Sequence, residues 1–561
     1  MPAAQHRPAP TARSTTTPAG TVAAAFDRAA TAWPQHAFLA VLPEAAAAYD
    51  IAAGELSYAD AQGRIATLRA AYAAAGYGHG HRVGLLLDNR PAFFLHWFAL
   101  NGLGASVVPI NADLRAAELE YLVGHSEMAL AVALAPRHAD LCAAALAAGR
   151  PLALMADGEP PPAAPFAAPQ AAAPVDELSE CALLYTSGTT GRPKGCMLPN
   201  RYYLHAGRWY AGVGGRATLR PGQERMLTPL PLVHMNAMAY SAMAMMLTGG
   251  CLIVLDRFHP ATWWASVRES RATVVHYLGV MPSMLMKTPP QPQDIQHRVR
   301  FGFGAGVDKA LHAPFEQRFG FPLLEAWAMT ETGAGAVVMA HDEPRAVGSS
   351  CFGREGDDVQ VLLVADDGSE PPAGEPGELW VRHAVDGRHT DPRYGFFAGY
   401  LKDEAATAEA WADGWFHTGD IVSRDAQGLL HFMDRRKNVI RRSGENISAV
   451  EVEGVLNQHP AVKAAAVAAT PDALRGDEVL ACVATHAPVP AAQREALAHS
   501  IVQHTLARLA YYKAPGYVVF VDALPLTASQ KISRGELKAQ APSWPGQPHC
   551  VDTRALKQRQ G

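Results

Sequence analysis

Short apolar runs alternate with alanine-rich segments along much of this chain of 561 residues. Runs of valine, isoleucine and leucine favour strands, and alanine-rich segments favour helices. The pattern predicts strands and intervening helices, with the strands at 83–87, 106–110, 129–134, 252–255 and 274–278 and helices such as 92–102 and 261–270. Strands that alternate with helices in this way form parallel sheets covered by helices, so the sequence predicts an α/β fold.

The length predicts more than one domain, because single hydrophobic cores stop growing at roughly 250–300 residues. Residues 1–18, rich in Pro, Ala, Thr and Arg, predict a disordered tail and not a secretory signal. Towards the C-terminus, a charged turn precedes a predicted helix at 449–457 and a predicted strand at 462–468. We therefore expect a large N-terminal domain over 19–433 and a small, mobile α+β domain over 434–561.

Composition and charge exclude several classes of protein. The formal net charge of −5 and the scattered Lys and Arg residues give no basic surface, so we expect no nucleic-acid partner. The seven cysteines form no C-x-x-C pair and show no metal-type spacing. This usage predicts a reducing cytoplasm and no structural zinc.

The segment 226–255 contains no Asp, Glu, Lys or Arg, as a membrane span would. Pro229, Pro231 and the Gly249–Gly250 pair interrupt it, however. We expect a loop, then a helix of about three turns, then the strand CLIVL. The methionines of this segment are interpreted as core filler, with pocket lining as the alternative. The sequence therefore predicts no membrane span.

The most specific local signal is the string LLYTSGTTGRPKG at 183–195. Its apolar start predicts the end of a buried strand. The following turn can direct backbone N–H groups and the hydroxyls of Thr186, Ser187, Thr189 and Thr190 at anionic oxygens. A mobile surface loop is the other interpretation of this composition, and the spacing does not match the Walker pattern G-x-x-x-x-G-K-[ST]. We predict a polyphosphate-binding loop of a different class of nucleotide enzyme.

With this string, the sequence resembles the adenylate-forming superfamily, which comprises acyl-CoA synthetases, adenylation domains of peptide synthetases and beetle luciferases. Further blocks follow in that family's order, namely GFGAGVD at 302–308, EAWAMTE at 325–331, GELWVR at 377–382, GWFHTGD at 414–420, DRRKNVIRRSGENISAVEVE at 434–453 and LPLTASQKISRGEL at 524–537. The resemblance is greatest to the crotonobetaine/carnitine-CoA ligase branch. It implies a large domain of parallel and mixed sheets covered by helices, a β-barrel-like subdomain and a small mobile C-terminal domain.

The resemblance also implies a set of catalytic residues. Lys531 stands in a P-x-T-x-S-x-K-I motif, where the family lysine meets the substrate carboxylate and the α-phosphate. Thr330 would contact the α-phosphate, and Lys194 is the lysine of the phosphate loop. Glu331 would hold Mg²⁺ with Thr186, as suits a hard cation that prefers oxygen ligands.

Contacts to the nucleotide and to coenzyme A follow from the same resemblance. Asp420 would accept the ribose hydroxyls, Arg435 would bind the ribose, and Gly444 would line the thiol channel. Trp327 stands where the family usually has a tyrosine, and Lys437 falls at the hinge of the small domain. The cofactor-binding residues implied in this way are Thr186, Ser187, Gly188, Thr189, Thr190, Gly191, Lys194, Gly304, Ala305, Gly306, Glu325, Ala326, Trp327, Thr330, Asp420, Arg435 and Gly444.

The acyl pocket is assigned by resemblance alone. Each of its residues could equally be an ordinary core residue. The implied lining residues are His234, Met235, Asn236, His276, Leu278, Gly279, Phe303 and Met329.

These features predict an ATP-dependent acid–thiol ligase. Such an enzyme converts a carboxylic acid to acyl-AMP with release of pyrophosphate, and then to acyl-CoA with release of AMP; its cofactors are ATP, Mg²⁺ and coenzyme A. The C-terminal domain would turn between the two steps. A stand-alone adenylation enzyme that loads a carrier protein is the main alternative, and a non-catalytic nucleotide-binding module is a remote one. A homodimer is compatible with the sequence.

Overall fold

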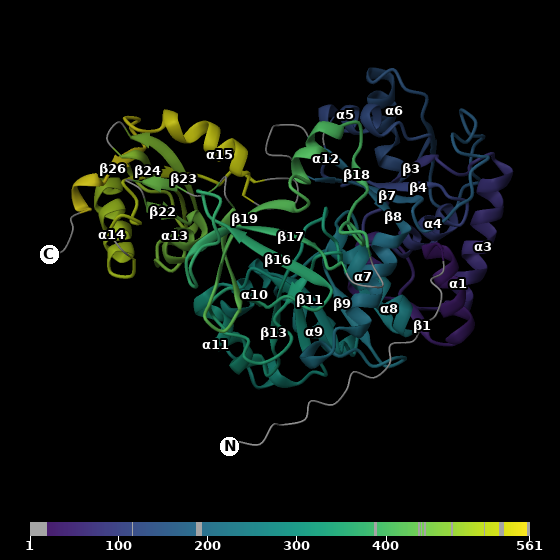
Figure 1. The fold of residues 1–561 in the computed structure, drawn as a ribbon, viewed down its shortest axis with the longest axis horizontal. Coiled ribbons are helices and arrows are strands. Elements are labelled where there is room, and N and C mark those ends of the chain that lie inside the picture. The colour runs from purple at the N-terminus through teal and green to yellow at the C-terminus, as the bar shows by residue number, and fades with distance from the viewer. Residues whose placement is uncertain are drawn as a thin grey trace.

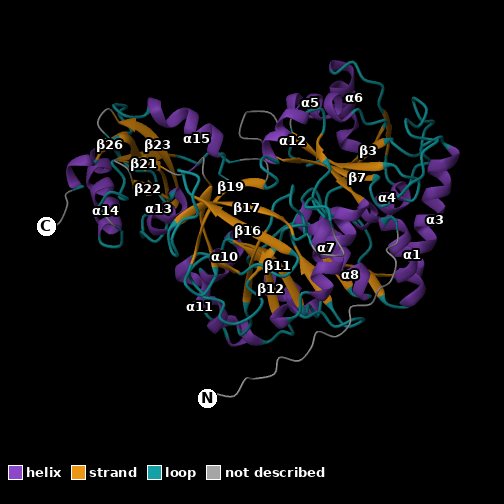
Figure 2. Cartoon of the chain, viewed as in Figure 1, coloured by secondary structure: helices purple, strands orange, loops and turns teal. Residues whose placement is uncertain are grey.

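The computed structural model describes residues 20–114, 116–186, 193–385, 390–435, 438, 440–442, 445–472, 475–509, 511–526 and 532–557. The tail predicted at 1–18 lies outside these residues. Four sheets with helices on their faces make up the fold, as Figure 2 shows with strands in orange and helices in purple. The α/β fold class predicted from the alternating pattern is confirmed.

The first sheet is a mixed sheet of eight strands. Its six central strands run parallel, and its two edge strands are antiparallel to their neighbours. The strand order is β14 (Val338–Met339), β13 (Leu323–Trp327), β12 (Phe301–Ala305), β11 (Val274–Leu278), β9 (Arg225–Thr228), β10 (Cys251–Val254), β1 (Ala37–Val41) and β2 (Gly54–Ser57).

The second sheet has seven strands, of which five are joined by parallel pairings. A hairpin of β7 and β8 and the short β18 extend it with antiparallel pairings. Its order is β18 (Gly399–Tyr400), β8 (Lys194–Pro199), β7 (Glu180–Thr186), β4 (Ser106–Pro109), β3 (Arg82–Leu86), β5 (Leu130–Ala133) and β6 (Ala153–Met155). The central strands are buried on both faces, which explains their continuous apolar sequences.

The third sheet has five antiparallel strands and corresponds to the β-barrel-like subdomain of the prediction. Its order is β15 (Cys351–Gly353), β20 (Leu430–Arg435), β19 (Phe416–Arg424), β17 (Pro376–His383) and β16 (Val359–Val364). Among the described residues no pairing joins β15 to β16, so this sheet is open and not a closed barrel.

The fourth sheet belongs to the C-terminal part of the chain. It contains β22 (Glu445–Ile447), β21 (Ile440–Arg442), β24 (Gly476–Thr485), β25 (Tyr517–Val521) and β26 (Cys550–Asp552), with β23 (Val462–Asp472) paired to β24. Figure 1 shows these strands and helices α13 to α15 gathered together on the left. Their apolar residues form clusters from Ile440 onward, separate from the core of the preceding sheets.

Fifteen α-helices occur among the described residues, and they cover the faces of these sheets. In the large part they are α1 (Val22–Ala32), α2 (Pro43–Tyr49), α3 (Tyr58–Ala74), α4 (Pro91–Asn101), α5 (Ala116–Ser126), α6 (His138–Ala147), α7 (Asn200–Gly212), α8 (Met243–Thr248), α9 (Trp263–Glu269), α10 (Val280–Met286), α11 (Lys309–Phe319) and α12 (Glu404–Ala410). In the C-terminal part they are α13 (Ala449–Leu456), α14 (Arg494–Leu506) and α15 (Arg534–Gln540).

Helix α4 illustrates how the sequence produces an element of the core. Proline at its first position suits a helix N-terminus, because proline lacks the N–H that would otherwise have no partner there. Most of the following side chains are apolar, and every residue from Ala92 to Asn101 is buried. A helix that is apolar on all sides lies inside a large domain.

The uncharged segment 226–255 is a core segment, as expected, with one correction. The prediction treated its beginning as a loop, and this is wrong, because Arg225–Thr228 forms β9 between β10 and β11. The helical part begins as a π-helix, η3 (Asn236–Ala242), and continues as α8. Most of its methionines are fully buried, in agreement with core filling. No described helix has the length and apolar character needed to span a membrane.

Candidate active site

The β7–β8 hairpin carries the two ends of the predicted phosphate loop. The buried strand end predicted there is confirmed, since β7 runs to Thr186 and Leu183 is fully buried. Thr186 is paired across the hairpin with Lys194, so the two side chains lie on the same face. The loop residues themselves lie outside the described residues; they are Ser187, Gly188, Thr189, Thr190 and Gly191.

Tyr400 connects Lys194 to Glu331. The Lys194 ammonium lies 4.8 Å from the centroid of the Tyr400 ring and 4.0 Å from a carboxylate oxygen of Asp403. The Tyr400 hydroxyl donates a hydrogen bond of 2.9 Å to Glu331 Oε1. Burial, and then the charge of Glu331, raise the pKa of Tyr400, so that its hydroxyl stays protonated as the donor. The predicted loop lysine and the predicted metal carboxylate are thus held by one side chain.

Glu331 meets the requirements of a magnesium ligand. It is buried in the turn that follows the half-buried Thr330, and its backbone carbonyl accepts the Phe397 N–H at 2.9 Å. Magnesium bound with phosphates uses one or two protein carboxylates and keeps several waters. One fixed carboxylate together with the hydroxyl of Thr186 fits this donor set. Within the described ranges no group of three or more His, Cys, Asp or Glu residues could hold a metal ion.

The predicted ribose-binding residues form a second group. Asp420 is buried on β19, opposite Arg435 on the neighbouring β20. Arg435 Nε lies 3.0 Å from Asp420 Oδ1. From β13, the indole N–H of Trp327 donates to Asp420 Oδ2 at 2.8 Å. Asp420 is therefore contacted by two other predicted nucleotide-binding residues, Trp327 from the first sheet and Arg435 from the third.

The glycine turn Gly304–Ala305–Gly306 spans the end of β12, whose last residue is Ala305, and leaves no space for a side chain at its first residue. A Cβ atom on Gly304 would collide with the carbonyl oxygen of Tyr277 on β11. Gly306 has φ +81°, in the left-handed region that glycine tolerates best. Ala305 is exposed at the strand end. The exposed residues of the turn, Ala305 and Gly306, therefore present little side chain to solvent, which suits the predicted adenine contact.

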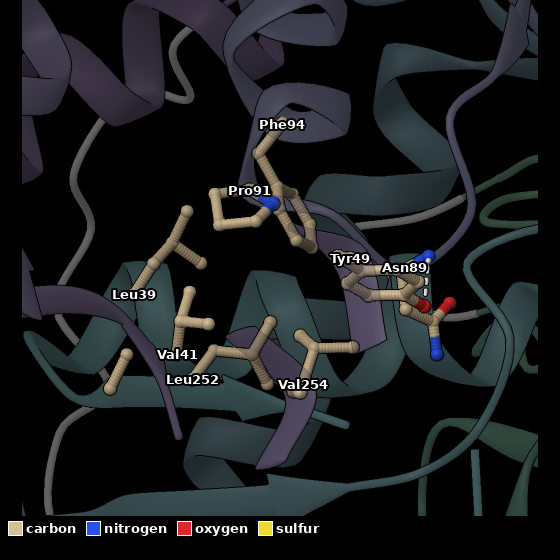
Figure 3. A pocket seen from close by; sticks show the side chains of 10 residues that line it. Leu39, Val41, Tyr49, Asn89, Pro91, Phe94, Leu252 and Val254 are labelled. Atoms are coloured by element: carbon tan, nitrogen blue, oxygen red, sulfur yellow. Dashed lines mark hydrogen bonds between the residues drawn. The ribbon is translucent and has the colours of Figure 1, made fainter. Parts of the chain in front are cut away.

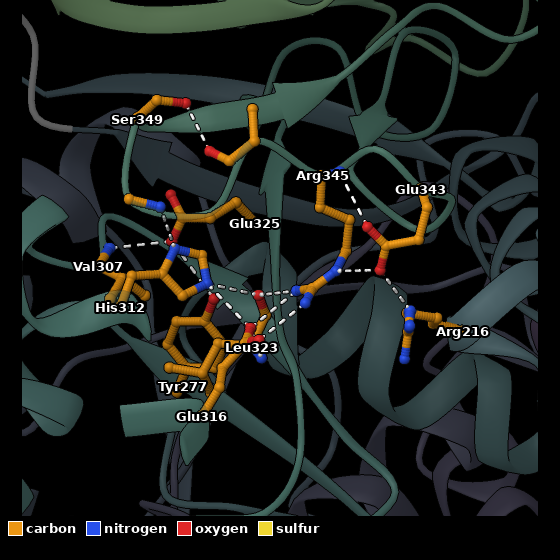
Figure 4. Close-up of polar contacts among 12 residues, drawn as sticks. Arg216, Tyr277, Val307, His312, Glu316, Leu323, Glu325, Glu343, Arg345 and Ser349 are labelled. Atoms are coloured by element: carbon orange, nitrogen blue, oxygen red, sulfur yellow. Dashed lines mark hydrogen bonds and ion pairs between the residues drawn. The ribbon is translucent and has the colours of Figure 1, made fainter. Parts of the chain in front are cut away.

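Glu325 holds the C-terminal end of this turn, and Figure 4 shows its carboxylate beside Val307. Its carboxylate accepts the Gly306 N–H at 3.2 Å and the Val307 N–H at 2.9 Å, and the Tyr277 hydroxyl donates to it at 3.3 Å. Burial raises the pKa of Glu325. The side chain that was predicted to contact nucleotide thus binds the backbone of the turn, while Ala326 beside it is half-buried on β13.

His276 on β11, a predicted acyl-pocket residue, contacts two others, Asn236 and Phe303. His276 Nδ1 lies 2.9 Å from Asn236 Oδ1, and the Tyr210 hydroxyl lies 3.1 Å from His276 Nε2. A consistent assignment has Nδ1–H donating to Asn236 and Nε2 accepting from Tyr210. The ring of Phe303 packs on the imidazole with 4.8 Å between centroids. Complete burial lowers the pKa of His276 to about 3, so the imidazole is neutral.

The remaining predicted pocket residues lie at the ends of the same elements. His234 and Met235 precede η3, Leu278 ends β11, and Met329 follows β13; all four are half-buried. Gly279 follows β11 and packs so closely on the glycine turn that a Cβ atom would collide with the carbonyl oxygen of Gly306. The predicted acyl and adenine regions are therefore adjacent.

Three functional predictions fall in the C-terminal part of the chain and lie outside the described residues. They concern the catalytic Lys531, the hinge residue Lys437 and the thiol-channel residue Gly444. Their roles remain predictions.

A small apolar cavity lies between β1, β10 and α4 (Figure 3). Its lining includes Leu39, Phe94 and Val254, and the Tyr49 hydroxyl accepts the backbone N–H of Asn89 at its edge. Its free volume of about 10 Å³ is close to the least that holds one water molecule. A cavity of this size cannot hold an organic acid, so it has no part in the site.

Sequence reasoning did not identify Tyr400 and Asp403 as functional residues. Both lie in the segment FFAGYLKD, which follows all other strands of the first two sheets in the sequence. It nevertheless joins the second sheet, where Gly399–Tyr400 forms β18. The register of β18 with β8 places Tyr400 beside Cys196, two residues from Lys194. An aromatic residue in a short edge strand carries no local signal of this kind.

Comparison with known proteins is consistent with this geometry. A family model described as AMP-binding enzyme matches residues 26–387, and one described as AMP-binding enzyme C-terminal domain matches residues 451–531. A crotonobetaine/carnitine–CoA ligase of Shigella flexneri is 31% identical over 483 residues, which cover 82% of this chain and 89% of the relative. A protein of the same name from Escherichia coli is 31% identical over 482 residues, with the same coverage.

Solved structures share the fold. ATP-bound MatB from Rhodopseudomonas palustris superposes with a TM-score of 0.74 at 24% identity, covering 92% of this chain and 98% of that one. The anthranilate CoA ligase AuaEII in complex with anthranoyl-AMP gives a TM-score of 0.77 at 21% identity, covering 93% of this chain and 97% of that one.

Proposed function

This chain belongs to the AMP-binding enzyme family, and on that premise we propose that it is an ATP-dependent acyl-CoA synthetase. In the first step a carboxylate oxygen attacks the α-phosphorus of ATP, and pyrophosphate leaves. In the second step the sulfur of coenzyme A attacks the acyl carbon, and AMP leaves. Charge develops on phosphate oxygens in the first step, so the site needs fixed cations and donors.

The bridge formed by Tyr400 carries this proposal. It brings the ammonium of Lys194 and the carboxylate of Glu331 together near the loop end of the β7–β8 hairpin. A cation and a magnesium ligand placed together suit the β- and γ-phosphates of a nucleotide better than any apolar ligand. Magnesium held by Glu331, Thr186 and the phosphates would neutralise the leaving pyrophosphate.

The other roles follow the family. Asp420 and Arg435 bind the ribose, the turn at Gly304–Gly306 faces the adenine, and Lys531 supplies the cation for the adenylation step. The C-terminal domain turns about Lys437 and brings Gly444 to the thiol channel for the second step. The roles of Asp420, Arg435 and the glycine turn are supported by the resemblance and by the contacts of these residues. Those of Lys531, Lys437 and Gly444 rest on the resemblance alone.

For the acid, we propose an aliphatic or aromatic carboxylic acid without a second charge. The side chains found around His276 are all neutral and include Asn236, Tyr210, Ser241 and Phe303, and His276 itself is uncharged. A second carboxylate would require a cation there, and a trimethylammonium group would be best served by a carboxylate.

The setting of the enzyme is also a proposal. All seven cysteines are free thiols, which suits a reducing cytoplasm. The chain would act there as a monomer or a homodimer.

Pyrophosphate exchange tests the function. Purified protein would be incubated with labelled pyrophosphate and a panel of aliphatic, aromatic, dicarboxylic and quaternary-ammonium acids. Label should enter ATP with at least one acid that carries no second charge. Adding coenzyme A should then release AMP. The Lys531→Ala variant is the control, because it should lose exchange while it still binds ATP. If none of the acids supports pyrophosphate exchange, the proposal is contradicted. If exchange occurs but coenzyme A does not release AMP, the acceptor would be a carrier protein.

A further inference from the structure

Trp327 and Asp420 come from different sheets and meet in a buried hydrogen bond. Trp327 ends β13 and is 6% exposed, while Asp420 lies on β19 and is 2% exposed. The indole N–H donates to Asp420 Oδ2 at 2.8 Å. A hydrogen bond to a charged group in such surroundings is stronger than one between neutral groups.

The hydrogen bond determines how the carboxylate is rotated. The terminal torsion of an aspartate side chain has a broad energy profile, so only its contacts fix the two oxygens. Trp327 holds Oδ2, and Arg435 Nε lies 3.0 Å from Oδ1. The backbone N–H of Asp420 is fixed as well, because it donates to the Thr418 hydroxyl at 3.0 Å.

Trp327, which donates a hydrogen bond to Asp420, and Arg435, which forms an ion pair with it, differ in how firmly they are placed. The side chain of Arg435 is 44% exposed and ends a strand at the margin of the large domain, whereas Trp327 is packed in the core. An exposed arginine pays more rotamer entropy and is screened by solvent. Trp327 is therefore the donor that keeps the carboxylate in one orientation.

Only an indole among the aromatic side chains of Trp, Tyr and Phe offers a ring N–H. We propose that Trp327 is a positioning residue for the nucleotide: its indole N–H orients the Asp420 carboxylate so that it accepts hydrogen bonds from the ribose hydroxyls. This rests on the proposed function, in which Asp420 binds the ribose. A carboxylate accepts about four hydrogen bonds, so the hydrogen bond from Trp327 and the ion pair with Arg435 are compatible with this role.

The test compares Trp327→Phe with the wild type on ATP, 2′-deoxy-ATP and 3′-deoxy-ATP. Nucleotide affinity is measured by calorimetry, and kcat and KM by pyrophosphate exchange. The wild type should prefer ATP over both analogues. In the variant we expect kcat/KM for ATP to fall about tenfold, and the preference for ATP to shrink by about the same factor, because the analogues lack a hydroxyl that the carboxylate would bind.

Two further variants control this comparison. Trp327→Tyr keeps a hydrogen-bonding aromatic ring but removes the indole N–H, so it should show the same reduced preference. Trp263→Phe removes an equally buried indole from α9, which contributes no predicted nucleotide contact, and its preference should match the wild type. Melting temperatures show that each variant is folded.

The outcomes separate the inference from the proposed function. The inference would be overturned if Trp327→Phe and Trp327→Tyr lowered kcat/KM by the same factor for ATP and for both analogues. Trp327 would then act only by packing or stacking. A wild type without preference for ATP would remove the ribose role of Asp420 and the inference with it. A wild type that neither binds ATP nor exchanges pyrophosphate would contradict the proposed function itself.

Discussion

At the scale of single residues, the site depends on side chains that hold other side chains. Tyr400 touches both Lys194 and Glu331, and His276 is held by Asn236 and Tyr210. A buried polar group is stable only when its hydrogen bonds are made, so each of these contacts also fixes geometry. Substitutions that remove one polar atom and keep the ring should reveal their roles.

The Tyr400→Phe variant should bind magnesium nucleotide less well. It removes the donor to Glu331 and leaves the ring beneath the Lys194 ammonium. Losing one hydrogen bond to a carboxylate costs about 1.5–3 kcal/mol, so the Mg²⁺ concentration for half-maximal exchange should rise roughly tenfold or more. Magnesium titrations of pyrophosphate exchange would measure this. Tyr203→Phe is the matched control, since the buried Tyr203 hydroxyl has no hydrogen-bond partner among the described residues. An unchanged Mg²⁺ requirement in Tyr400→Phe would exclude the positioning of Glu331.

Acid should destabilise the protein through His276. The pKa of this side chain is about 3 in the folded chain and about 6.5 when exposed. Below pH 6.5 the unfolded chain binds a proton that the folded chain does not, so the free energy of unfolding falls as the pH is lowered towards 3. His276→Gln should remove this contribution, which is about 1.4 kcal/mol per pH unit in that window. Urea unfolding at several pH values would show it, and parallel pH profiles of the variant and the wild type would contradict it.

At the scale of elements, the site forms where neighbouring strands end. The parallel strands β11, β12 and β13 finish at Leu278, Ala305 and Trp327. The glycine turn consists of the last two residues of β12 and Gly306, and Gly279 follows β11 directly. Ligands bind at the carboxyl ends of parallel strands because helices and loops leave a crevice there. Close backbone packing between these strand ends is therefore part of the site.

The Gly279→Ala variant should disturb both the fold and nucleotide binding. Its Cβ atom would collide with the carbonyl oxygen of Gly306, which is backbone and cannot turn aside. Overpacking of this kind costs roughly 1–3 kcal/mol, and displacing the turn should raise the KM for ATP. Gly454→Ala in α13 is the control, because open space surrounds that position; it should be neutral or stabilising by about 0.5–1 kcal/mol. Chemical unfolding and exchange kinetics measure both effects. A Gly279→Ala enzyme with normal stability and KM would show that the turn can relax at no cost.

At the scale of the whole molecule, two parts of the chain bury their apolar residues separately. The apolar clusters of the large part contain residues up to Leu430, and those of the C-terminal part begin at Ile440. The described contacts between the parts include the hydrogen bond of 2.9 Å from the Ser448 hydroxyl to the Met433 carbonyl. Parts with separate cores can move relative to one another, as a two-step cycle requires.

A protein limited to residues 20–438 should therefore fold and bind ATP but lack exchange activity. It keeps Lys194, Glu331 and Asp420 and loses the predicted catalytic Lys531. Near-ultraviolet circular dichroism would report its packing, calorimetry its ATP affinity, and labelled pyrophosphate its activity. Exchange at the full-length rate would remove the catalytic role of Lys531, and an unfolded fragment would contradict the independence of the two cores.

The sequence alone determined the order and type of the main elements and the family of the chain. Apolar runs become strands wherever both faces of a sheet are buried, and motif strings such as TSGTTGRPKG keep their order whatever surrounds them. The π-helix and β9 were missed, because a short apolar run does not distinguish loop from strand, and the π-helix depends on its packing.

Tertiary structure alone decided which residues meet. The bridge from Tyr400 to Lys194 and Glu331, and the hydrogen bond from Trp327 to Asp420, join segments far apart in the chain. Glu325 turned out to hold the glycine turn by its backbone N–H groups. Local patterns fix periodicity and turns, but distances between remote side chains follow from how sheets stack and strands register, and no single segment carries that information.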